Sequence, residues 1–264
     1  MMNRLLVAGC ALTLFLHSLD GRQVQERPSV ERHLGGVIRA DRSQKTINLV
    51  FTGHEFADGG ATIRAVLKEH GIKASFFFTG DFYRNHRFGV LITQLIDDGH
   101  YLGAHSDKHL LYCSWEKRDS LLVSKTEFFN DLAANYIELD RFCIAREKAP
   151  YFMPPYEWYN EQISAWCKEF GLTLVSFTPG TSSNADYTTP DMGRQYVTSD
   201  TIYQRILRYE QTHKDGLNGF ILLLHIGTHP ARIDKFYEKL DLLVTELLRR
   251  GYHFTRIDES LKSR

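Results

Sequence analysis

Short apolar runs alternate with longer amphipathic stretches from about residue 45 to the end of the chain. The short runs are rich in β-branched and aromatic residues and predict strands, whereas the longer stretches repeat apolar residues at helical spacing. Several of these longer stretches end at a glycine, which is typical of a helix C-terminus. The expected strands are 46–51, 73–80, 100–105, 149–156, 172–177, 219–225 and 253–257, and the expected helices are 60–71, 89–99, 116–142 (capped by Ser114), 160–171, 199–213 and 233–251.

This alternation of seven strands with six helices predicts a single α/β domain with a parallel sheet covered by helices. The pattern alone fits either an open, doubly wound sheet or a closed barrel. Both architectures place functional side chains at the carboxyl ends of the strands. Residues that follow the predicted strands are therefore the ones to examine for chemistry.

The amino-terminal residues follow a different pattern. Arg4 precedes an apolar run at 5–16 that is too short to span a bilayer and is typical of a secretory signal peptide. We predict a signal peptide at 1–21, a polar leader at 22–44 and the folded domain at 45–264. The stretch LVAGC also matches a lipoprotein cleavage box, so a lipid anchor at Cys10 is the alternative to ordinary cleavage. An exported protein, periplasmic or extracellular, is expected either way.

Charge and cysteine content narrow the classes of partner. Lys+Arg and Asp+Glu number 32 each, and the net charge is zero. No overall field favours nucleic acid, and no membrane partner is expected beyond the anchor at Cys10. The four cysteines include no C-x-x-C pair, so neither a disulfide framework nor a cysteine zinc site is predicted. Those beyond Cys10 are expected to be buried free thiols.

Polar and aromatic side chains gather where the predicted strands end, in FTGHEFADGG (51–60), GAHSDKH (103–109), FMPPYEWYN (152–160), FTPGTSSNADY (177–187) and ILLLHIGTH (221–229). Taken in order, HSDKH, PPYEWY and ILLLH resemble the motifs of the metal-dependent polysaccharide deacetylases, the carbohydrate esterases similar to the nodulation chitooligosaccharide deacetylase. The flanking stretches VLKEHGIKASFFFTGDF and LIDDGHYLGAHS are similar to that family as well. The resemblance runs from about Ile47 to Ile257.

The resemblance implies a distorted (β/α) barrel of about seven parallel strands, with the catalytic domain at 45–264. It also implies removal of acetyl groups from N- or O-acetylated sugars by metal-activated water. His105 and His109 match the family's two metal-binding histidines. Zinc is the expected ion, although cobalt or nickel would also suit two imidazoles and a carboxylate. The expected partner is an acetylated oligo- or polysaccharide.

Further matches assign roles around the bond that is cut. His225 matches the general acid, a role that suits histidine because its ordinary pKa lies near neutral pH. Tyr156 matches the residue whose backbone N–H stabilises the oxyanion. Leu223 matches the apolar wall of the acetyl-methyl pocket. Trp158 is expected either to form a wall facing the sugar or to belong to the core.

The family's first motif, T-F-D-D, supplies the general base and the third metal ligand, and this chain lacks it. With Phe51 aligned on the motif phenylalanine, Thr52 and Gly53 replace both carboxylates. Met153 stands where an arginine usually holds the base, and the fourth motif's aspartate is not found at the strand end 177–187. These losses are mutually consistent, because a buried arginine without its carboxylate would be costly. They indicate either a rebuilt site or one abandoned for chemistry.

For a rebuilt site, the loop after the first strand offers three groups. Asp58, followed by two glycines, is the candidate third metal ligand, and the alternative is that it caps the next helix. His54 or Glu55 is the candidate base. Three other polar residues could reach the same rim or be ordinary surface residues: Asp186, His229 and Arg232.

The leading hypothesis is therefore an exported, metal-dependent hydrolase of acetylated saccharides, with His105, His109 and Asp58 as ligands and His225 as acid. One alternative is a catalytically silent saccharide-binding protein on the same barrel. Another is a metal-dependent hydrolase of non-sugar amide bonds, which a deep apolar pocket would favour.

Overall fold

The computed structural model describes residues 30–262 of the chain. The predicted signal peptide at 1–21 and the cleavage box at Cys10 lie outside these residues. No helix within residues 30–262 is long and apolar enough to cross a membrane.

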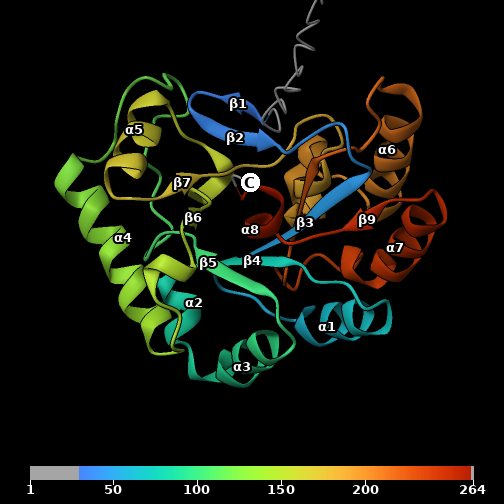
Figure 1. Cartoon of the computed structure of the whole chain (residues 1–264), viewed down its shortest axis with the longest axis horizontal. Coiled ribbons are helices and arrows are strands. Elements are labelled where there is room, and N and C mark those ends of the chain that lie inside the picture. The colour runs from blue at the N-terminus through green and yellow to red at the C-terminus, as the bar shows by residue number, and fades with distance from the viewer. Residues whose placement is uncertain (1–29, 263–264) are drawn as a thin grey trace, which may run out of the picture.

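A curled sheet forms the centre of the molecule, and the longer helices cover its outer face (Figure 1). Between residues 30 and 262 it contains nine strands: β1 (Glu31–His33), β2 (Gly36–Arg39), β3 (Thr46–Gly53), β4 (Ser75–Phe78), β5 (Tyr101–Ala104), β6 (Tyr151–Phe152), β7 (Thr173–Leu174), β8 (Phe220–His225) and β9 (His253–Phe254). Their order is β1-β2-β8-β3-β4-β5-β6-β7, and β9 pairs with β3. Strands β3 to β9 pair with one another only in parallel. The predicted distorted (β/α) barrel is confirmed.

The helices of the described chain are α1 (Gly60–Glu69), α2 (Gly80–Arg84), α3 (Gly89–Asp97), α4 (Lys125–Asp140), α5 (Glu161–Glu169), α6 (Ser199–Thr212), α7 (Leu240–Arg249) and α8 (Ile257–Ser260). All except the short α2 and α8 occupy stretches that the apolar spacing predicts. The buried sides of α1, α3, α5 and α7 supply the aliphatic residues of the outer core, for example Ile63 and Leu95.

The central strands are buried on both faces. Residues 47–53 of β3 and all residues of β4 are buried, and Phe76, Phe77 and Phe78 have no exposed surface. Side chains of a barrel strand point alternately to the interior and to the surrounding helices, so both sets must be apolar. This explains why these strands appear in the sequence as continuous apolar runs.

An N-terminal hairpin completes the sheet. Strand β2 pairs antiparallel with β8, where Arg39 lies opposite Phe220. A single parallel bridge joins Val37 to Val175, just after β7. The hairpin β1–β2 therefore fills the seam between β7 and β8 and brings the two edges of the curled sheet together.

The expected helix at 116–142 is shorter than its prediction and begins at Lys125. Ser124 accepts a hydrogen bond from the Glu127 backbone N–H at 3.2 Å, and the Glu127 carboxylate accepts one from the Ser124 N–H at 2.7 Å. This capping box fixes the helix start ten residues beyond the expected cap, Ser114. Residues 114–122 instead form a turn, in which the Ser114 N–H donates to the Ser120 carbonyl.

The capping box predicts a measurable effect on stability. Ser124→Ala should lower the free energy of unfolding by about 1 kcal/mol, because the side-chain partner of an N-terminal amide is lost. Ser120→Ala is the control, since Ser120 is exposed and its side chain makes no hydrogen bond within residues 30–262. Urea unfolding curves of both variants would measure the difference; equal midpoints would contradict the assignment of the cap.

Candidate active site

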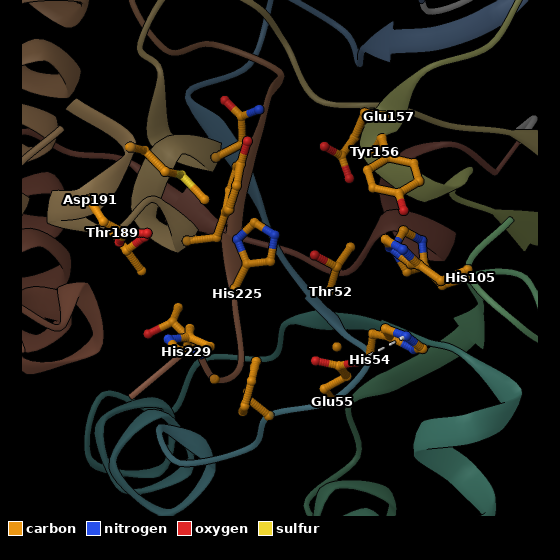
Figure 2. A pocket seen from close by; sticks show the side chains of 18 of the residues that line it. Thr52, His54, Glu55, His105, Tyr156, Glu157, Thr189, Asp191, His225 and His229 are labelled. Carbon is orange, nitrogen blue, oxygen red and sulfur yellow. Dashed lines mark ion pairs between the residues drawn. The ribbon is translucent and has the colours of Figure 1, made fainter. Parts of the chain in front are cut away.

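A pocket of about 730 Å³ lies at the carboxyl ends of the parallel strands (Figure 2). His54 follows β3, His105 follows β5, and His225 ends β8. Tyr156 belongs to a short 3-10 helix, η3 (Pro155–Glu157), which follows β6. The sequence prediction that these strand ends form one site agrees with the shared pocket. The lining residues are Thr52–Phe56, His105, His109, Trp115, Tyr156, Glu157, Asn184, Tyr187, Thr189, Asp191, Met192, His225 and Gly227–His229.

His225 is held by a buried carboxylate. Its Nδ1 lies 2.6 Å from Asp186 Oδ1, and its backbone N–H donates to Asp186 Oδ2 at 2.8 Å. Asp186 belongs to the 3-10 helix η4 (Ser183–Tyr187) and is only 2% exposed. With Nδ1 engaged, Nε2 is the ring nitrogen available to the pocket. Asp186, which the sequence left open as a rim residue or an ordinary surface residue, is therefore the buried partner of His225.

The charges around His225 favour its protonated form. Burial alone would lower the pKa of His225, but the charge and hydrogen bond of Asp186, together with the charge of Glu157, outweigh burial and raise it. An imidazole whose pKa is raised while it faces a pocket is a suitable proton donor near neutral pH.

The loop that carries His105 and His109 is anchored by a second buried carboxylate. Asp131 of α4 accepts hydrogen bonds from the Ser106 hydroxyl and from the backbone N–H groups of Asp107 and Lys108, at 3.0–3.2 Å. Ser106 and His109 both have left-handed backbone conformations, with φ of 72° and 56°. Such conformations are uncommon for residues with side chains and persist where the surrounding structure fixes them.

The two histidines of this loop are neutral imidazoles. Burial lowers the pKa of His105 to about 3 and that of His109, with help from neighbouring histidines, to about 2. His105 Nδ1 lies 2.7 Å from the Met153 carbonyl oxygen, so it carries the proton and leaves the Nε2 lone pair free. Met153, which the resemblance aligns with an arginine of the family, is completely buried.

The expected third ligand, Asp58, points into a different network. Its carboxylate accepts hydrogen bonds from the Thr228 N–H at 2.8 Å and the Tyr237 hydroxyl at 2.9 Å, and it pairs with Lys235 at 2.9 Å. Burial would raise the pKa of Asp58, but these partners lower it. Asp58 does not line the pocket, and the structure does not bring it to His105.

We therefore tested whether the residues present fit a divalent metal. The rings of the two expected ligands, His105 and His109, have centroids 5.1 Å apart and an interplanar angle of 62°. The His54 ring instead stacks nearly parallel on that of His109, with centroids 4.7 Å apart and an interplanar angle of 10°, so it does not converge with His109 on one ion. Within residues 30–262, no group of three or more His, Cys, Asp or Glu side chains is placed to hold an ion. The predicted three-ligand set of His105, His109 and Asp58 is therefore not assembled.

Of the two candidate bases after β3, His54 faces inward and Glu55 outward. His54 Nδ1 lies 3.1 Å from the Thr79 hydroxyl, and its Nε2 lies 4.0 Å from a Glu55 carboxylate oxygen. The Glu55 side chain is 66% exposed. Both residues line the pocket. Because the Glu55 side chain is largely exposed, its carboxylate is solvated by bulk water.

Aromatic residues form one wall of the pocket, though not the set that the sequence predicts. Tyr156 lines the pocket beside Trp115, with ring centroids 5.5 Å apart. Trp158 lies behind Trp115 and donates from Nε1 to the Ser114 carbonyl at 3.2 Å, so it supports the wall without lining the pocket. Leu223 is fully buried within β8 and does not line the pocket either.

Several site residues are visible only in the structure. Glu157, directly after the PPY motif, lines the pocket, and so do Trp115 and Tyr187. His229 lines the pocket, which agrees with the first of the two roles considered for it, a residue at the rim. Arg232 is instead fully buried, where its guanidinium donates to the carbonyls of Thr188 and Val197. Of the three cysteines within residues 30–262, Cys113 and Cys167 are buried, whereas Cys143 is exposed, contrary to expectation.

With this geometry in view, comparison with known proteins shows the class of the molecule. The family model for polysaccharide deacetylase matches residues 39–175. The chain belongs to the polysaccharide deacetylase family.

Individual relatives extend the match beyond these residues. The peptidoglycan-N-acetylmuramic acid deacetylase PdaA of Bacillus subtilis is 26% identical over 223 residues, which cover 82% of this chain and 71% of that protein. Its solved structure gives a TM-score of 0.66 at 23% identity, covering 86% of this chain and 85% of the other. This likeness supports the same fold.

Two other solved structures bear on the chemistry. A pseudoenzyme of carbohydrate esterase family 4 from Bacillus anthracis gives a TM-score of 0.66 at 21% identity, covering 88% of this chain and 70% of the other. A family 4 acetyl xylan esterase from Clostridium thermocellum, in complex with a cobalt ion, gives 0.61 at 19% identity, covering 81% and 89%. The fold therefore occurs both in a metal-bound esterase and in a pseudoenzyme.

The space around Gly53 predicts that the lost carboxylate cannot simply be restored there. A Cβ at position 53 would lie 2.8 Å from Ile226 Cγ2, 2.9 Å from Phe78 Cδ1 and 3.0 Å from Phe82 Cε2. Gly53→Asp should therefore destabilise the protein by about 1–3 kcal/mol through overpacking.

Thr52→Val is the matched variant on the same strand. The buried Thr52 hydroxyl has no hydrogen-bond partner within the described chain, so removing it should leave stability unchanged or higher. Thermal unfolding of the two variants would measure the contrast. If Gly53→Asp unfolds at the same temperature as wild type, the neighbouring side chains move aside without loss of stability, and the prediction is wrong.

Proposed function

We propose that this protein hydrolyses acetyl groups from an acetylated saccharide, with His225 as the general acid. The observation that carries the proposal is the His225–Asp186 pair, a buried carboxylate 2.6 Å from the imidazole of a residue that lines the pocket. This arrangement fixes the ring, leaves Nε2 available and favours the protonated form. Membership of the polysaccharide deacetylase family supports the reaction class.

Acetyl hydrolysis makes two demands besides proton donation. The tetrahedral intermediate places negative charge on the former carbonyl oxygen, which a positioned N–H can stabilise. The Tyr156 N–H makes no hydrogen bond within residues 30–262, and Tyr156 lines the pocket, so this N–H is free to serve. The leaving amine or alkoxide needs a proton, which His225 Nε2 supplies.

The walls of the pocket suit a sugar ring. Trp115, Tyr156 and Tyr187 line it and are each about half exposed, at 56%, 46% and 47%. Exposed aromatic faces pack against the apolar faces of sugar rings, while their edges and polar neighbours reach hydroxyl groups. The proposal includes export through the signal peptide at 1–21, because the named relative acts on peptidoglycan.

The acid assignment predicts a change in pH dependence. His225→Ala should lower kcat/KM for acetate release by about 10²–10⁴-fold. In Asp186→Asn the pKa of His225 should fall, because the negative charge of Asp186, which raises that pKa in wild type, is lost. Since His225 acts in its protonated form, the alkaline limb of the pH–rate profile should move to lower pH.

Acetate release from N-acetylated chitooligosaccharides, peptidoglycan fragments and acetylated xylan would provide the rates. Asp200→Asn is the matched control, because Asp200 is 83% exposed and pairs with Lys239 away from the pocket. If the alkaline limb of the Asp186→Asn profile lies at the same pH as that of wild type, the role of the His225–Asp186 pair is contradicted.

The incomplete ligand set predicts weak dependence on metal. Dialysis against EDTA should leave acetate release unchanged, and elemental analysis should find less than one zinc, cobalt or nickel ion per chain. Apo protein restored with each of these ions is the comparison. Activity lost on chelation and recovered with an ion would show that His54, His105 and His109 rearrange into a metal site.

The loss of both motif carboxylates supports a second candidate, a saccharide-binding protein that does not cut. Thr52 and Gly53 occupy those positions, and a pseudoenzyme with this fold exists. Binding without acetate release, measured by calorimetry with the same oligosaccharides, would favour this candidate. It predicts that His225→Ala leaves glycan affinity nearly unchanged.

A further inference from the structure

Glu157 is a carboxylate of the pocket that takes no part in proton donation or in oxyanion stabilisation. It lies on the wall formed by η3, next to Tyr156, and Figure 2 shows its carboxylate extending into the pocket toward the space between His225 and Thr52. Its side chain accepts no hydrogen bond from any residue of the described chain. Glu157 is of intermediate exposure, whereas the two buried carboxylates near the site are both hydrogen-bonded: Asp131 accepts from Ser106, Asp107, Lys108 and Tyr112, and Asp186 pairs with the backbone N–H and the ring of His225.

The backbone at Glu157 is strained. Tyr156 and Glu157 are consecutive residues with side chains in the left-handed region, at φ of 59° and 51°. Glycine adopts this conformation without penalty, so a glutamate here carries a conformational cost and, through burial, an electrostatic one. Residues that keep such strain cluster at functional sites, where the strained geometry positions a reacting group. Within residues 30–262, no hydrogen bond or ion pair holds the Glu157 carboxylate in this conformation, and the side chain is only partly buried.

The surroundings of Glu157 suit the activation of water. His225, with Asp186 behind it, lies on the far side of the pocket and interacts electrostatically with Glu157. Thr52, in the position of the family's missing base, faces the same space, and its buried hydroxyl is not bonded within residues 30–262. Water in the pocket can therefore approach the Glu157 carboxylate, which no group of the described chain occupies, beside His225.

We propose that Glu157 is the general base of this site and takes over the role of the aspartate absent at position 52; this inference rests on the proposed function. The Glu157 carboxylate removes one proton from a water molecule as the water oxygen bonds to the acetyl carbon. The bond from that carbon to the sugar nitrogen or oxygen then breaks, and His225 Nε2 protonates the leaving atom. The products are acetate and the deacetylated sugar, and Glu157 returns its proton through solvent to His225.

The protonation behaviour of Glu157 agrees with this role. Burial raises its pKa to about 7, with the charge of His225 lowering it and that of Asp186 raising it. Tyr187 also faces it, and the Glu157 charge contributes to the raised pKa of that phenol. A base whose pKa lies near the working pH combines sufficient ionisation with sufficient basicity. The rate should therefore rise with pH through about 7, because the reaction needs the ionised carboxylate.

The first test replaces the carboxylate with its amide. Glu157→Gln should lower kcat for acetate release by about 10²-fold or more, change KM by less than about threefold, and remove the ascending limb of the pH–rate profile. Glu161→Gln, on an exposed residue of α5 outside the pocket, is the control and should behave as wild type. Glu55→Gln tests the rival base from the loop after β3.

The second test separates catalysis from folding. Glu157→Gly should raise Tm, since glycine relieves the left-handed strain and removes a buried carboxylate, while acetate release falls as in Glu157→Gln. Loss of activity together with higher stability would not arise from a residue with a merely structural role. Sodium formate or azide, as a small external base, should partly restore the rate of Glu157→Gly.

The outcomes separate the inference from the function on which it rests. An active wild type whose rate falls in Glu157→Gln but not in Glu55→Gln supports the inference. An active wild type with an active Glu157→Gln, or with a rate lost only in Glu55→Gln, overturns the inference and leaves the proposed function standing. A wild type that binds the oligosaccharides and releases no acetate under any condition overturns both.

Discussion

The site depends on the parallel pairing of β3 with β8. Six consecutive residue pairs join the two strands, from Ile47 opposite Phe220 to Thr52 opposite His225. The register is fixed because both strands are buried on both faces, and a shift by one residue would turn every side chain to the other side. It sets His225 beside Thr52, the position where the resemblance leads one to expect a carboxylate. A carboxylate that acts at this point has to come from a neighbouring loop, either after β3, as Glu55 does, or after β6, as Glu157 does.

Two buried carboxylates then hold the loops around that point. Asp131 fixes the loop after β5, and Asp186 brings the long segment after β7 back to His225. A buried charge is costly unless several donors surround it, and both residues meet that condition. The loss of the first motif has thus not loosened the pocket. Its frame is intact, while the space next to Gly53 is filled by apolar side chains and Met153 fills the place of an arginine.

Much of this could be predicted from the sequence, because strand and helix periods and the order of motifs are local. The barrel, the histidines of the loop after β5 and His225 at a strand end belong to that part. The helix expected from Glu116 was too long. Charged residues such as those at 116–119 occur both in turns and in the first turn of a helix, and the capping box of Ser124 and Glu127 starts the helix later. The direction of Asp58 and the return of Asp186 to His225 are tertiary, since they depend on partners more than 30 residues away in the chain. The left-handed backbone conformation of Glu157 could not be predicted from the sequence, because residues with side chains rarely adopt a positive φ.

The hairpin that fills the seam also determines which way the pocket faces. Glu31 pairs with Arg39, and Arg39 lies opposite Phe220, at the amino end of β8, whereas His225 at the carboxyl end of that strand lines the pocket. The described chain therefore begins near the floor of the barrel, roughly 17 Å from the pocket residue His225 at about 3.3 Å per strand residue. Residue 30 therefore lies on the face of the barrel opposite the pocket. Contacts made at that end of the described chain leave the mouth of the pocket open.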